Sequence, residues 1–344
     1  METTVLSTQD TKAVALGADL IRTGGLVAFP TETVYGLGAD GLDGAAVDRI
    51  FEAKGRPNDN PLILHVAQKE DAFRLWAGEP PFARQLMDTF WPGPLTLIYY
   101  RSKIVPDEVT ASLDTVAVRM PDNEAARALI AAAGAPIAAP SANLSGKPSP
   151  TTAQHVLQDM SGRIPLILDG GPCRCGVEST VLSLVGTPTI LRPGAITKEM
   201  LAAVIGEVSL AHSILKPLEA GEKAASPGMK YRHYAPNAQV LVAVGEAEAA
   251  AARLSALYDE WTAQGKRVAI AATAEALPFY GDRRTALMGS RRDPATLCRR
   301  LFSLLRELDG DSDVILCEGV GTEGAGLAFM NRLLRSAGFR VEYL

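Results

Sequence analysis

The sequence predicts a two-domain α/β protein in which a mixed, twisted sheet is followed by a smaller α/β domain. Its 344 residues exceed the length of one average domain and suit two. Hydrophobic residues make up 47% and charged residues 21%, which is typical of a well-filled core rather than of a disordered chain. Short β-branched and leucine-rich runs alternate with segments of helical periodicity, as in an α/β fold.

The expected first domain, residues 1–208, contains helices and strands that alternate without strict pairing. Helices are expected over 8–23, from Asp43 to Gly55, near 80–90, over about 123–134, near 151–160 and after Thr197. Strands are expected at 26–29, 61–66, 95–100, 115–120, 166–171, 179–184 and 189–194. This irregular alternation favours a mixed sheet over a regular parallel one.

Periodicity is lost over residues 209–238, which include the stretch SPGMKYRHYAP and are predicted to form a linker. Residues 239–344 are expected to form a compact second α/β domain with a parallel sheet. Its expected strands are 239–245, 267–273 and 312–319, and its expected helices are 246–264, 294–309 and 326–337.

Composition excludes several classes of protein. The net charge of −5 argues against a surface that grips nucleic-acid phosphates over many base pairs, but it permits a small cationic pocket. No apolar run approaches the ~20 residues of a membrane span, and the N-terminus lacks a signal pattern, so a cytosolic protein is expected. Cys173 and Cys175 lack the second pair or histidine cluster of a zinc site, and two reduced loop cysteines are the simpler interpretation.

Hydroxyl and cationic side chains gather in the stretches PTETVYGLG and EAKGRPNDNPLILHV. Lys54 falls in the last turn of a predicted helix, where a cation complements the helix dipole without any further role. Arg56 lies outside that helix, so the two cations can converge on one anion. Together with His65 on the next strand, they predict a cationic cluster beside the loop of Thr31 and Thr33.

The strand TVAVRM also carries polar residues. Thr115, Ala117 and Arg119 share one of its faces, because side chains alternate along a strand. An arginine and a threonine on one face of a valine-rich strand indicate that this face meets a polar cavity. The alternative is an edge strand with a solvated arginine.

The stretch APSANLSGKPSP places further polar groups just past an apolar strand, where open α/β sheets bind ligands. Ser141 and Asn143 supply a hydroxyl and an amide, and Ser145, Lys147 and Ser149 extend the polar loop. The alternative is an ordinary loop with Asx and Ser turns. Further polar residues stand at later strand ends, namely Ser179, Thr180 and Arg192.

The glycine-rich stretch GVGTEG, residues 319–324, fits G-x-G-x-x-G but lacks the acidic residue that a dinucleotide site needs about twenty positions on. A glycine turn that permits close packing is therefore favoured. The sequence contains no P-loop, nucleophile elbow or His-x-x-x-His pair. Cations, hydroxyls and amides without an evident nucleophile suit the binding of anionic groups and electrostatic stabilisation of a phosphoryl-type transition state.

The ordered series FPTETVYGLG, the K-x-R of AKGRP, NPLILHV, the S-x-N of APSANLSG and ESTV…LRPG resembles the YrdC-like family. SPGMKYRHYAP and the second domain are similar to its long form, the threonylcarbamoyl-AMP synthases. The resemblance covers essentially the whole chain and implies a YrdC-like catalytic domain plus a smaller, Rossmann-like C-terminal domain. One departure is that Leu182 and Ser183 follow STV, where members often carry an acidic residue.

The resemblance implies an L-threonylcarbamoyladenylate synthase, which is a nucleotidyltransferase. L-threonine and bicarbonate would form a carbamate, whose oxygen attacks the α-phosphate of ATP and releases pyrophosphate. Mg²⁺ would arrive with ATP rather than in a dedicated protein site. The product would pass to a tRNA threonylcarbamoyl transferase complex that modifies an adenosine beside the anticodon, with direct tRNA binding by this chain weak or absent.

The family's functional residues carry over by matching motif. The implied catalytic residues are Lys54, Arg56, Ser141 and Asn143. The implied L-threonine-binding residues are Thr33, His65, Arg119, Ala139 and Ser179. The implied ATP-binding residues are Arg56, Asn60, Thr115, Ser141, Ser149, Arg192 and Tyr234. The linker, extended, reaches on the order of 100 Å, so a lid is expected from Tyr231, His233 and Tyr234.

Two alternatives stay open at this point. A concave cationic sheet could accept double-stranded RNA, although the net charge of −5 argues against an RNA-binding module. A carbamoyl transferase acting on another acceptor, as in hydrogenase maturation, is weakened by the absence of acylphosphatase-like and zinc-finger segments.

Overall fold

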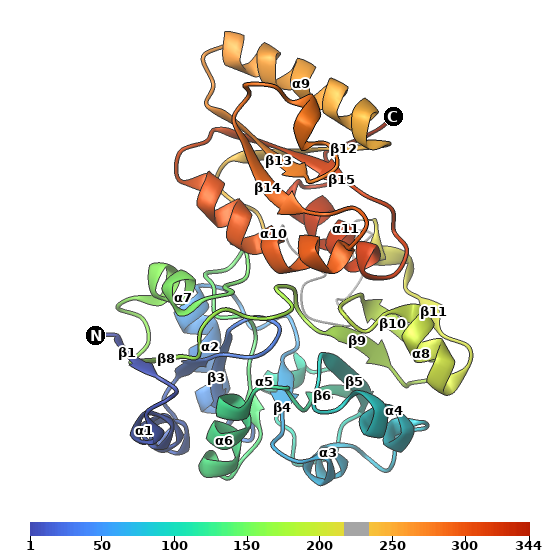
Figure 1. Cartoon of the computed structure of the whole chain (residues 1–344). Helices are drawn as coiled ribbons and strands as arrows, with labels where there is room; N and C mark the ends of the chain where they lie inside the picture. Colours follow the sequence, from blue (N-terminus) through green and yellow to red (C-terminus); the bar gives the residue numbers. More distant parts are fainter. Residues whose placement is uncertain (217–233) are drawn as a thin grey trace.

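The computed structural model describes residues 1–216 and 234–344, which form two sheets (Figure 1). The first part of the chain builds an 11-stranded mixed sheet, and the last part builds a 5-stranded parallel sheet. The predicted α/β class, with a mixed sheet and a smaller Rossmann-like domain, is therefore confirmed. Within the described ranges, every helix is too short or too polar to span a bilayer.

The N-terminal sheet interleaves strands that are far apart in sequence. They are β1 (Thr4–Ser7), β2 (Val27–Phe29), β3 (Gly36–Asp40), β4 (Ile63–His65), β5 (Leu95–Tyr100), β6 (Thr115–Arg119), β7 (Ile137–Ala138), β8 (Leu166–Asp169), β9 (Thr180–Ser183), β10 (Thr189–Arg192) and β11 (Ser209–Leu210). Their order across the sheet is β1-β8-β2-β3-β7-β4-β6-β5-β9-β10-β11. Parallel pairs such as β4 with β6 alternate with antiparallel pairs such as β2 with β3.

The register at the centre of this sheet brings distant polar residues together. His65 of β4 and Arg119 of β6 are paired positions on neighbouring parallel strands. On the other side of β4, the Ala139 backbone N–H donates to the Ile63 carbonyl at 3.0 Å, so the chain leaving β7 passes along β4. Two residues later, Ser141 makes an isolated antiparallel bridge with Gly36. Because of these pairings, three segments of the predicted site meet at one place.

Helices pack against the N-terminal sheet. They are α1 (Thr11–Arg22), α2 (Gly44–Lys54), α3 (Lys69–Leu75), α4 (Ala83–Phe90), α5 (Asp107–Thr110), α6 (Glu124–Ala133), α7 (Ala153–Met160) and α8 (Lys198–Ile205), with the short 3₁₀ turn η1 (His212–Ile214) after β11. The Asp43 side chain caps α2 by accepting from the Ala45 N–H, and Gly55 ends the helix in the left-handed conformation at φ 68°. Lys54 and Arg56 therefore stand on either side of a sharp turn.

The C-terminal domain has helices on both faces of its sheet. Its strands are β12 (Gln239–Val244), β13 (Val268–Thr273), β14 (Thr285–Gly289), β15 (Val314–Gly319) and β16 (Val341–Tyr343), in the order β14-β13-β15-β12-β16. Its helices are α9 (Ala247–Ala263), α10 (Pro294–Asp309) and α11 (Ala325–Ser336), with the 3₁₀ turn η2 (Leu277–Phe279). Figure 1 shows α10 and α11 between this sheet and the N-terminal domain, with α9 on the far side.

The two domains are in direct contact through α10 and α11. Gly176 has a left-handed φ of 77°, and a Cβ there would lie 2.4 Å from the Arg299 Cα, so only glycine allows α10 to approach this closely. Arg299 donates to the Arg174 carbonyl at 2.9 Å. Arg306 of α10 forms a buried ion pair with Asp159 of α7, with Nη2 and Oδ2 2.7 Å apart.

Several elements differ from the sequence predictions. The helix predicted over 8–23 begins at Thr11, because Asp10 caps it by accepting from the Lys12 N–H. β3 was not predicted, since GLGAD lacks β-branched residues and is a strand only through its pairing with β2 and β7. In the GVGTEG stretch, a Cβ at Gly319 would lie 2.5 Å from Val244, so this glycine serves close packing.

Candidate active site

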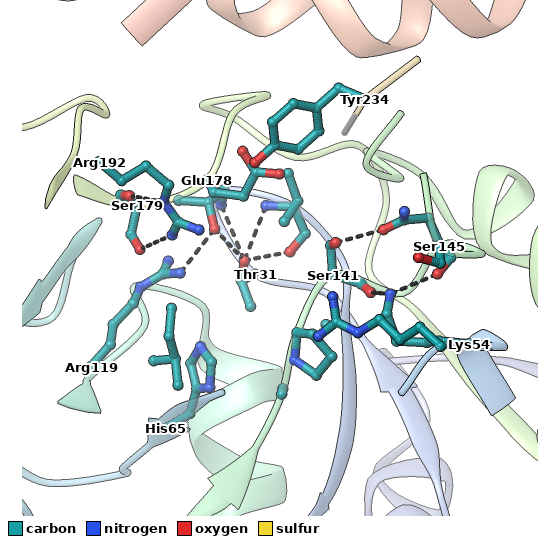
Figure 2. Close-up of a pocket in the computed structure, with 18 of the residues that line it drawn as sticks. Thr31, Lys54, His65, Arg119, Ser141, Ser145, Glu178, Ser179, Arg192 and Tyr234 are labelled. Atoms are coloured by element: carbon teal, nitrogen blue, oxygen red, sulfur yellow. Dashed lines mark hydrogen bonds between the residues drawn. The ribbon is translucent and has the colours of Figure 1, made fainter. Parts of the chain in front are cut away.

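A cavity opens where the ends of β4 and β6 meet the loops around Ser141 and Ser179 (Figure 2). The space that protein atoms leave there is about 720 Å³, its open mouth included. The lining residues are Thr31, Thr33, Val34, Gly36, Lys54, Arg56, Ile63, His65, Arg119, Ala139, Pro140, Ser141, Asn143, Ser145, Gly146, Glu178, Ser179, Arg192 and Tyr234.

Most of the residues predicted for the site line this one cavity, although their segments are far apart in sequence. They are Thr33, Lys54, Arg56, His65, Arg119, Ala139, Ser141, Asn143, Ser179, Arg192 and Tyr234. Asn60, Thr115 and Ser149 are not among the lining residues. Tyr231 and His233, predicted as part of a lid, lie outside the described residues.

The predicted residues outside the lining have distinct surroundings. Asn60 is wholly buried, and neither polar atom of its side chain has a hydrogen-bond partner among the described residues. Thr115 begins β6, four residues before Arg119 and so about 13 Å away along the strand. Ser149 is buried and donates from Oγ to Glu178 Oε1 at 2.5 Å. Ser149 therefore contacts a lining residue, Glu178, without lining the cavity itself.

Arg119 anchors the Thr31–Thr33 loop. Its Nη1 donates to Thr33 Oγ1 at 3.0 Å, and its Nε donates to the Gly93 carbonyl at 3.2 Å. Its Nη2 lies 2.6 Å from Glu32 Oε1 in an ion pair whose two side chains are almost completely buried. Thr31 Oγ1 in turn lies 2.8 Å from Thr33 Oγ1. The edge-strand alternative for Arg119 is wrong, because β6 lies between β4 and β5 in the sheet.

His65 is held in its neutral form. Burial, together with the adjacent positive charge of Arg119, lowers the pKa of His65 from 6.5 to about 3. The ring makes an edge contact with Phe29, with centroids 6.2 Å apart. Its Nδ1 atom is buried and has no hydrogen-bond partner in the described part of the chain. A neutral imidazole can therefore offer a hydrogen bond without adding charge to the pocket.

The shifted pKa of His65 predicts an acid-sensitive fold. Between about pH 6.5 and 3 the unfolded chain binds a proton at this residue that the folded chain does not, so the unfolding free energy falls as pH falls through that window. Replacing His65 by Asn should reduce the loss of stability between pH 7.5 and 5 by about 2 kcal/mol. Urea denaturation of both proteins at both pH values measures this difference, and an unchanged pH dependence would contradict it.

Lys54 joins the end of α2 to the Ser141 loop. Its Nζ donates to the Ser141 carbonyl at 2.5 Å and to the Asn143 carbonyl at 2.6 Å. Burial, together with the nearby positive charge of Arg56, holds the pKa of Lys54 well below its ordinary value. The Arg56 guanidinium lies over the Phe51 ring, 5.2 Å from its centroid. Two cations thus share one side of the cavity, and an anion there would relieve their mutual repulsion.

The same loop is ordered by its own side chains. Ser141 Oγ donates to Asn143 Oδ1 at 2.5 Å. Asn143 Nδ2 donates to the carbonyls of Leu144 and Lys147 at 2.8 Å and 2.9 Å. The ordinary-loop alternative therefore explains Asn143 in part, because its amide holds the loop in shape. The loop also presents the Ser141 and Ser145 residues to the cavity.

Arg192 lines the same side of the cavity as Arg119 (Figure 2). Arg192 Nε and Nη2 donate to the backbone carbonyl and to Oγ of Ser179, both at 3.1 Å. Ser179 Oγ also lies 2.8 Å from Thr96 Oγ1. Burial lowers the pKa of Arg192 to about 10, so the side chain keeps its positive charge at neutral pH.

Glu178 lines the cavity but was not predicted as a site residue. Burial by itself would raise the pKa of Glu178, but Arg332 and Arg192 outweigh burial and hold the pKa below its ordinary value. The carboxylate is therefore ionised, and it balances part of the positive charge around it. The signal in the sequence was the acidic residue in GVEST, among otherwise small and apolar neighbours.

Tyr234 covers the cavity from the side of the C-terminal domain (Figure 2). Its ring packs on Phe302 of α10, with centroids 5.0 Å apart, and the residue is only 5% exposed. The next residue, Ala235, donates its N–H to the Gly146 carbonyl at 2.8 Å. Of the three predicted lid residues, Tyr234 is thus tied to both domains at the mouth of the pocket.

The lining combines the cations of Lys54, Arg56, Arg119 and Arg192 with hydroxyl groups and a single carboxylate. Convergent positive charge of this kind binds polyanions and stabilises charge that develops during phosphoryl or nucleotidyl transfer. Nowhere in residues 1–216 and 234–344 do three or more His, Cys, Asp or Glu side chains gather so that they could hold a metal ion. The four cysteines are free thiols. The fold and the site define an α/β enzyme of the nucleotidyltransferase type.

Comparisons with known proteins agree with that class. The Sua5/YciO/YrdC family model, which carries the description "Telomere recombination", matches residues 19–194, and the model for the threonylcarbamoyl-AMP synthase C-terminal domain matches residues 196–338. The chain belongs to the threonylcarbamoyl-AMP synthase family, as the resemblance in its sequence predicts.

Similar proteins match over nearly their whole length. The threonylcarbamoyl-AMP synthase of Bacillus subtilis is 48% identical over 339 residues, which cover 98% of this chain and 96% of that protein. The one of Pyrococcus abyssi is 47% identical over 334 residues, 95% of each chain. The structure of Pyrococcus abyssi Sua5 complexed with L-threonine has a TM-score of 0.92 at 44% identity and covers 99% of this chain and 100% of that one.

Proposed function

We propose that this protein condenses L-threonine, bicarbonate and ATP to threonylcarbamoyl-AMP and pyrophosphate. The observation that carries the proposal is one cavity in which four cations from three separate segments converge beside hydroxyl groups. Two anionic reactants, a carbamate and a nucleoside triphosphate, repel each other in solution. A cavity with positively charged walls lowers the cost of bringing them together.

The reaction needs positioning and charge neutralisation more than it needs a protein nucleophile. The L-threonine amine attacks bicarbonate and forms an N-carboxy group, with loss of water. An oxygen of that carbamate then forms a bond to the α-phosphorus of ATP, while the bond to the pyrophosphate oxygen breaks. Because a carbamate loses carbon dioxide readily in water, a site covered by Tyr234 and closed behind by the sheet protects it.

The L-threonine end of the pocket is assigned to Thr33, His65, Arg119, Ala139 and Ser179, in agreement with the sequence resemblance. Arg119 is held by Thr33 and Glu32, so it can meet a carboxylate without first being ordered. The neutral His65 adds a hydrogen-bonding group there without a charge.

The ATP end is assigned to six lining residues, Lys54, Arg56, Ser141, Asn143, Arg192 and Tyr234. Asn60, Thr115 and Ser149 do not line the cavity and are assigned to ATP by the sequence resemblance alone. Lys54 and Arg56 would neutralise the phosphates. Since burial and Arg56 depress the pKa of Lys54, a bound triphosphate raises that pKa again and favours its charged form. Mg²⁺ would enter on the triphosphate as part of the substrate.

The product is assigned to tRNA modification in the cytoplasm. Threonylcarbamoyl-AMP is an activated acyl donor, so a separate transferase complex would move its threonylcarbamoyl group to the adenosine beside the tRNA anticodon. The net charge of −5 supports weak or absent direct binding of tRNA by this chain.

Mass spectrometry of the products tests the proposal. The purified protein is incubated with ATP, Mg²⁺, L-threonine and bicarbonate, and threonylcarbamoyl-AMP and pyrophosphate should appear together, in equal amounts, and only when all three substrates are present. AMP without a threonylcarbamoyl adduct would contradict the assignment. Steeply salt-dependent binding of double-stranded RNA without any adenylate product would favour the RNA-binding alternative instead.

Tyr234 is expected to contact the nucleotide through its ring. Tyr234→Ala should raise KM for ATP about tenfold, because stacking of an aromatic side chain on a base contributes about 1–3 kcal/mol. Tyr234→Phe keeps the ring and should stay within about threefold of the wild type. Both variants retain a Cβ at this left-handed position, where φ is 65°, so backbone strain is matched between them. Equal effects of the two variants would contradict a role of the ring.

A further inference from the structure

An arginine of the C-terminal domain is completely buried against the wall of the substrate pocket. Arg332 of α11 has 0% of its surface exposed. Its Nε donates to Glu178 Oε2 at 2.8 Å, its Nη2 to the Glu178 carbonyl at 3.2 Å, and its Nη1 to the Pro193 carbonyl at 2.8 Å. Burying a guanidinium is costly unless its donors are satisfied, and here they are satisfied largely by the other domain.

The groups that Arg332 holds are the immediate neighbours of two pocket residues. Glu178 precedes Ser179 in the chain, and Pro193 follows Arg192. Ser179 and Arg192 are themselves joined by two hydrogen bonds of 3.1 Å. The two segments also touch backbone to backbone, since a Cβ at Gly194 would lie 2.3 Å from the Thr180 nitrogen. Arg332 therefore links, by hydrogen bonds, the segment that carries Ser179 to the segment that carries Arg192.

Glu178 extends the connection to a third segment. One carboxylate oxygen accepts from Arg332, and the other accepts from Ser149 Oγ. Three residues assigned to substrate binding, Ser149, Ser179 and Arg192, are thus linked to α11 through the contacts of one side chain, Arg332. Arg332 itself does not line the cavity, so it acts on the substrates only through these neighbours.

We propose that Arg332 is a positioning residue of the active site: by holding Glu178 and the Pro193 carbonyl, it fixes Ser179 and Arg192 where they bind the substrates. The C-terminal domain then completes the substrate pocket instead of only covering it. This inference rests on the proposed function, because that function supplies the roles of Ser179 and Arg192. A guanidinium suits the task, since its planar fork reaches several acceptors at once.

The test compares four variants of the full chain. Arg332→Met removes the donors, and Arg332→Lys keeps the charge without the fork. Arg332→Met with Glu178→Gln removes both charges, so that no carboxylate is left buried without its partner. Arg299→Met is the control, because Arg299 also crosses the domain boundary, to the Arg174 carbonyl at 2.9 Å, but neither Arg299 nor Arg174 is among the residues that line the cavity.

Arg332→Met should lower kcat/KM for ATP and for L-threonine about 100-fold, as expected when binding groups are misplaced rather than removed. Arg332→Lys should recover part of this loss, and Arg299→Met should stay within about threefold of the wild type. Calorimetric titration with L-threonine alone should show the same weakening in Arg332→Met, so the readout does not depend on turnover.

Thermal unfolding separates positioning from folding. If Arg332→Met does not unfold in one cooperative transition, the double variant and Arg332→Lys decide the matter in its place. Folded variants of Arg332 that bind L-threonine and turn over like Arg299→Met would overturn the inference while the wild type still makes threonylcarbamoyl-AMP. A wild-type protein that makes no threonylcarbamoyl-AMP would instead refute the proposed function.

Discussion

Replacement of Arg56 by alanine is expected to abolish formation of threonylcarbamoyl-AMP while leaving the fold intact. Arg56 stands just past the end of α2, lines the cavity and shares it with Lys54. Removing a cation that stabilises charge developing on transferred phosphate typically costs at least about 100-fold in rate. Mass spectrometry of the adenylate and a pyrophosphate-release assay measure the loss.

Arg84 provides a matched control for this variant. Arg56 lies over the Phe51 ring at 5.2 Å and Arg84 lies over the Phe73 ring at 4.7 Å, so both alanine variants lose an arginine–phenylalanine contact. Arg84 does not line the cavity. Arg84→Ala should therefore have normal turnover. Adenylate formation by Arg56→Ala at the rate of Arg84→Ala would show that the K-x-R pair has been assigned wrongly.

Replacement of Arg119 by methionine is expected to destabilise the protein and to remove its activity. The substitution leaves the Glu32 carboxylate buried without the guanidinium that now lies 2.6 Å away. Breaking a buried ion pair by removing one partner costs about 3–5 kcal/mol. Urea denaturation should show this loss as a lower midpoint with an unchanged slope.

A second substitution separates the two effects. Glu32→Gln combined with Arg119→Met removes the isolated charge, so part of the lost stability should return. Activity should not return, because the cation assigned to the L-threonine carboxylate is still missing. A double variant that regained both stability and turnover would mean that Arg119 serves the fold alone.

Local sequence signals predicted the three helices of the C-terminal domain and three of its five strands, β12, β13 and β15. The helix expected over 294–309 is α10, Pro294–Asp309, because proline is favoured in the first turn of a helix and Gly310 follows its end. β14, Thr285–Gly289, was missed because its sequence, TALMG, has a single β-branched residue and depends on pairing with β13. Elements that depend on tertiary partners more than on their own composition are the ones that local patterns do not predict.

The residues of the candidate site also divide into those with a local sequence signal and those that depend on distant partners. Lys54, Arg56 and Ser141 could be predicted, since each lies in a short motif whose residue types indicate anion binding. Glu178 was not predicted: its acidic side chain stands out in GVEST, but the contact that holds it, with Arg332, is 154 residues away in the chain. Pairings at that separation have no local pattern. The sequence resemblance predicted candidate binding residues but not the contact between Glu178 and Arg332.

The interleaved order of the N-terminal sheet affects how the protein is made on the ribosome. β8, residues Leu166–Asp169, lies between β1 and β2, so both of these early strands are synthesised long before their shared neighbour. Until translation passes residue 169, each presents an unpaired edge to which other chains can add. A molecular chaperone that shields those edges on the nascent polypeptide would therefore raise the yield of folded enzyme, and synonymous codons that slow translation before β8 would lower it.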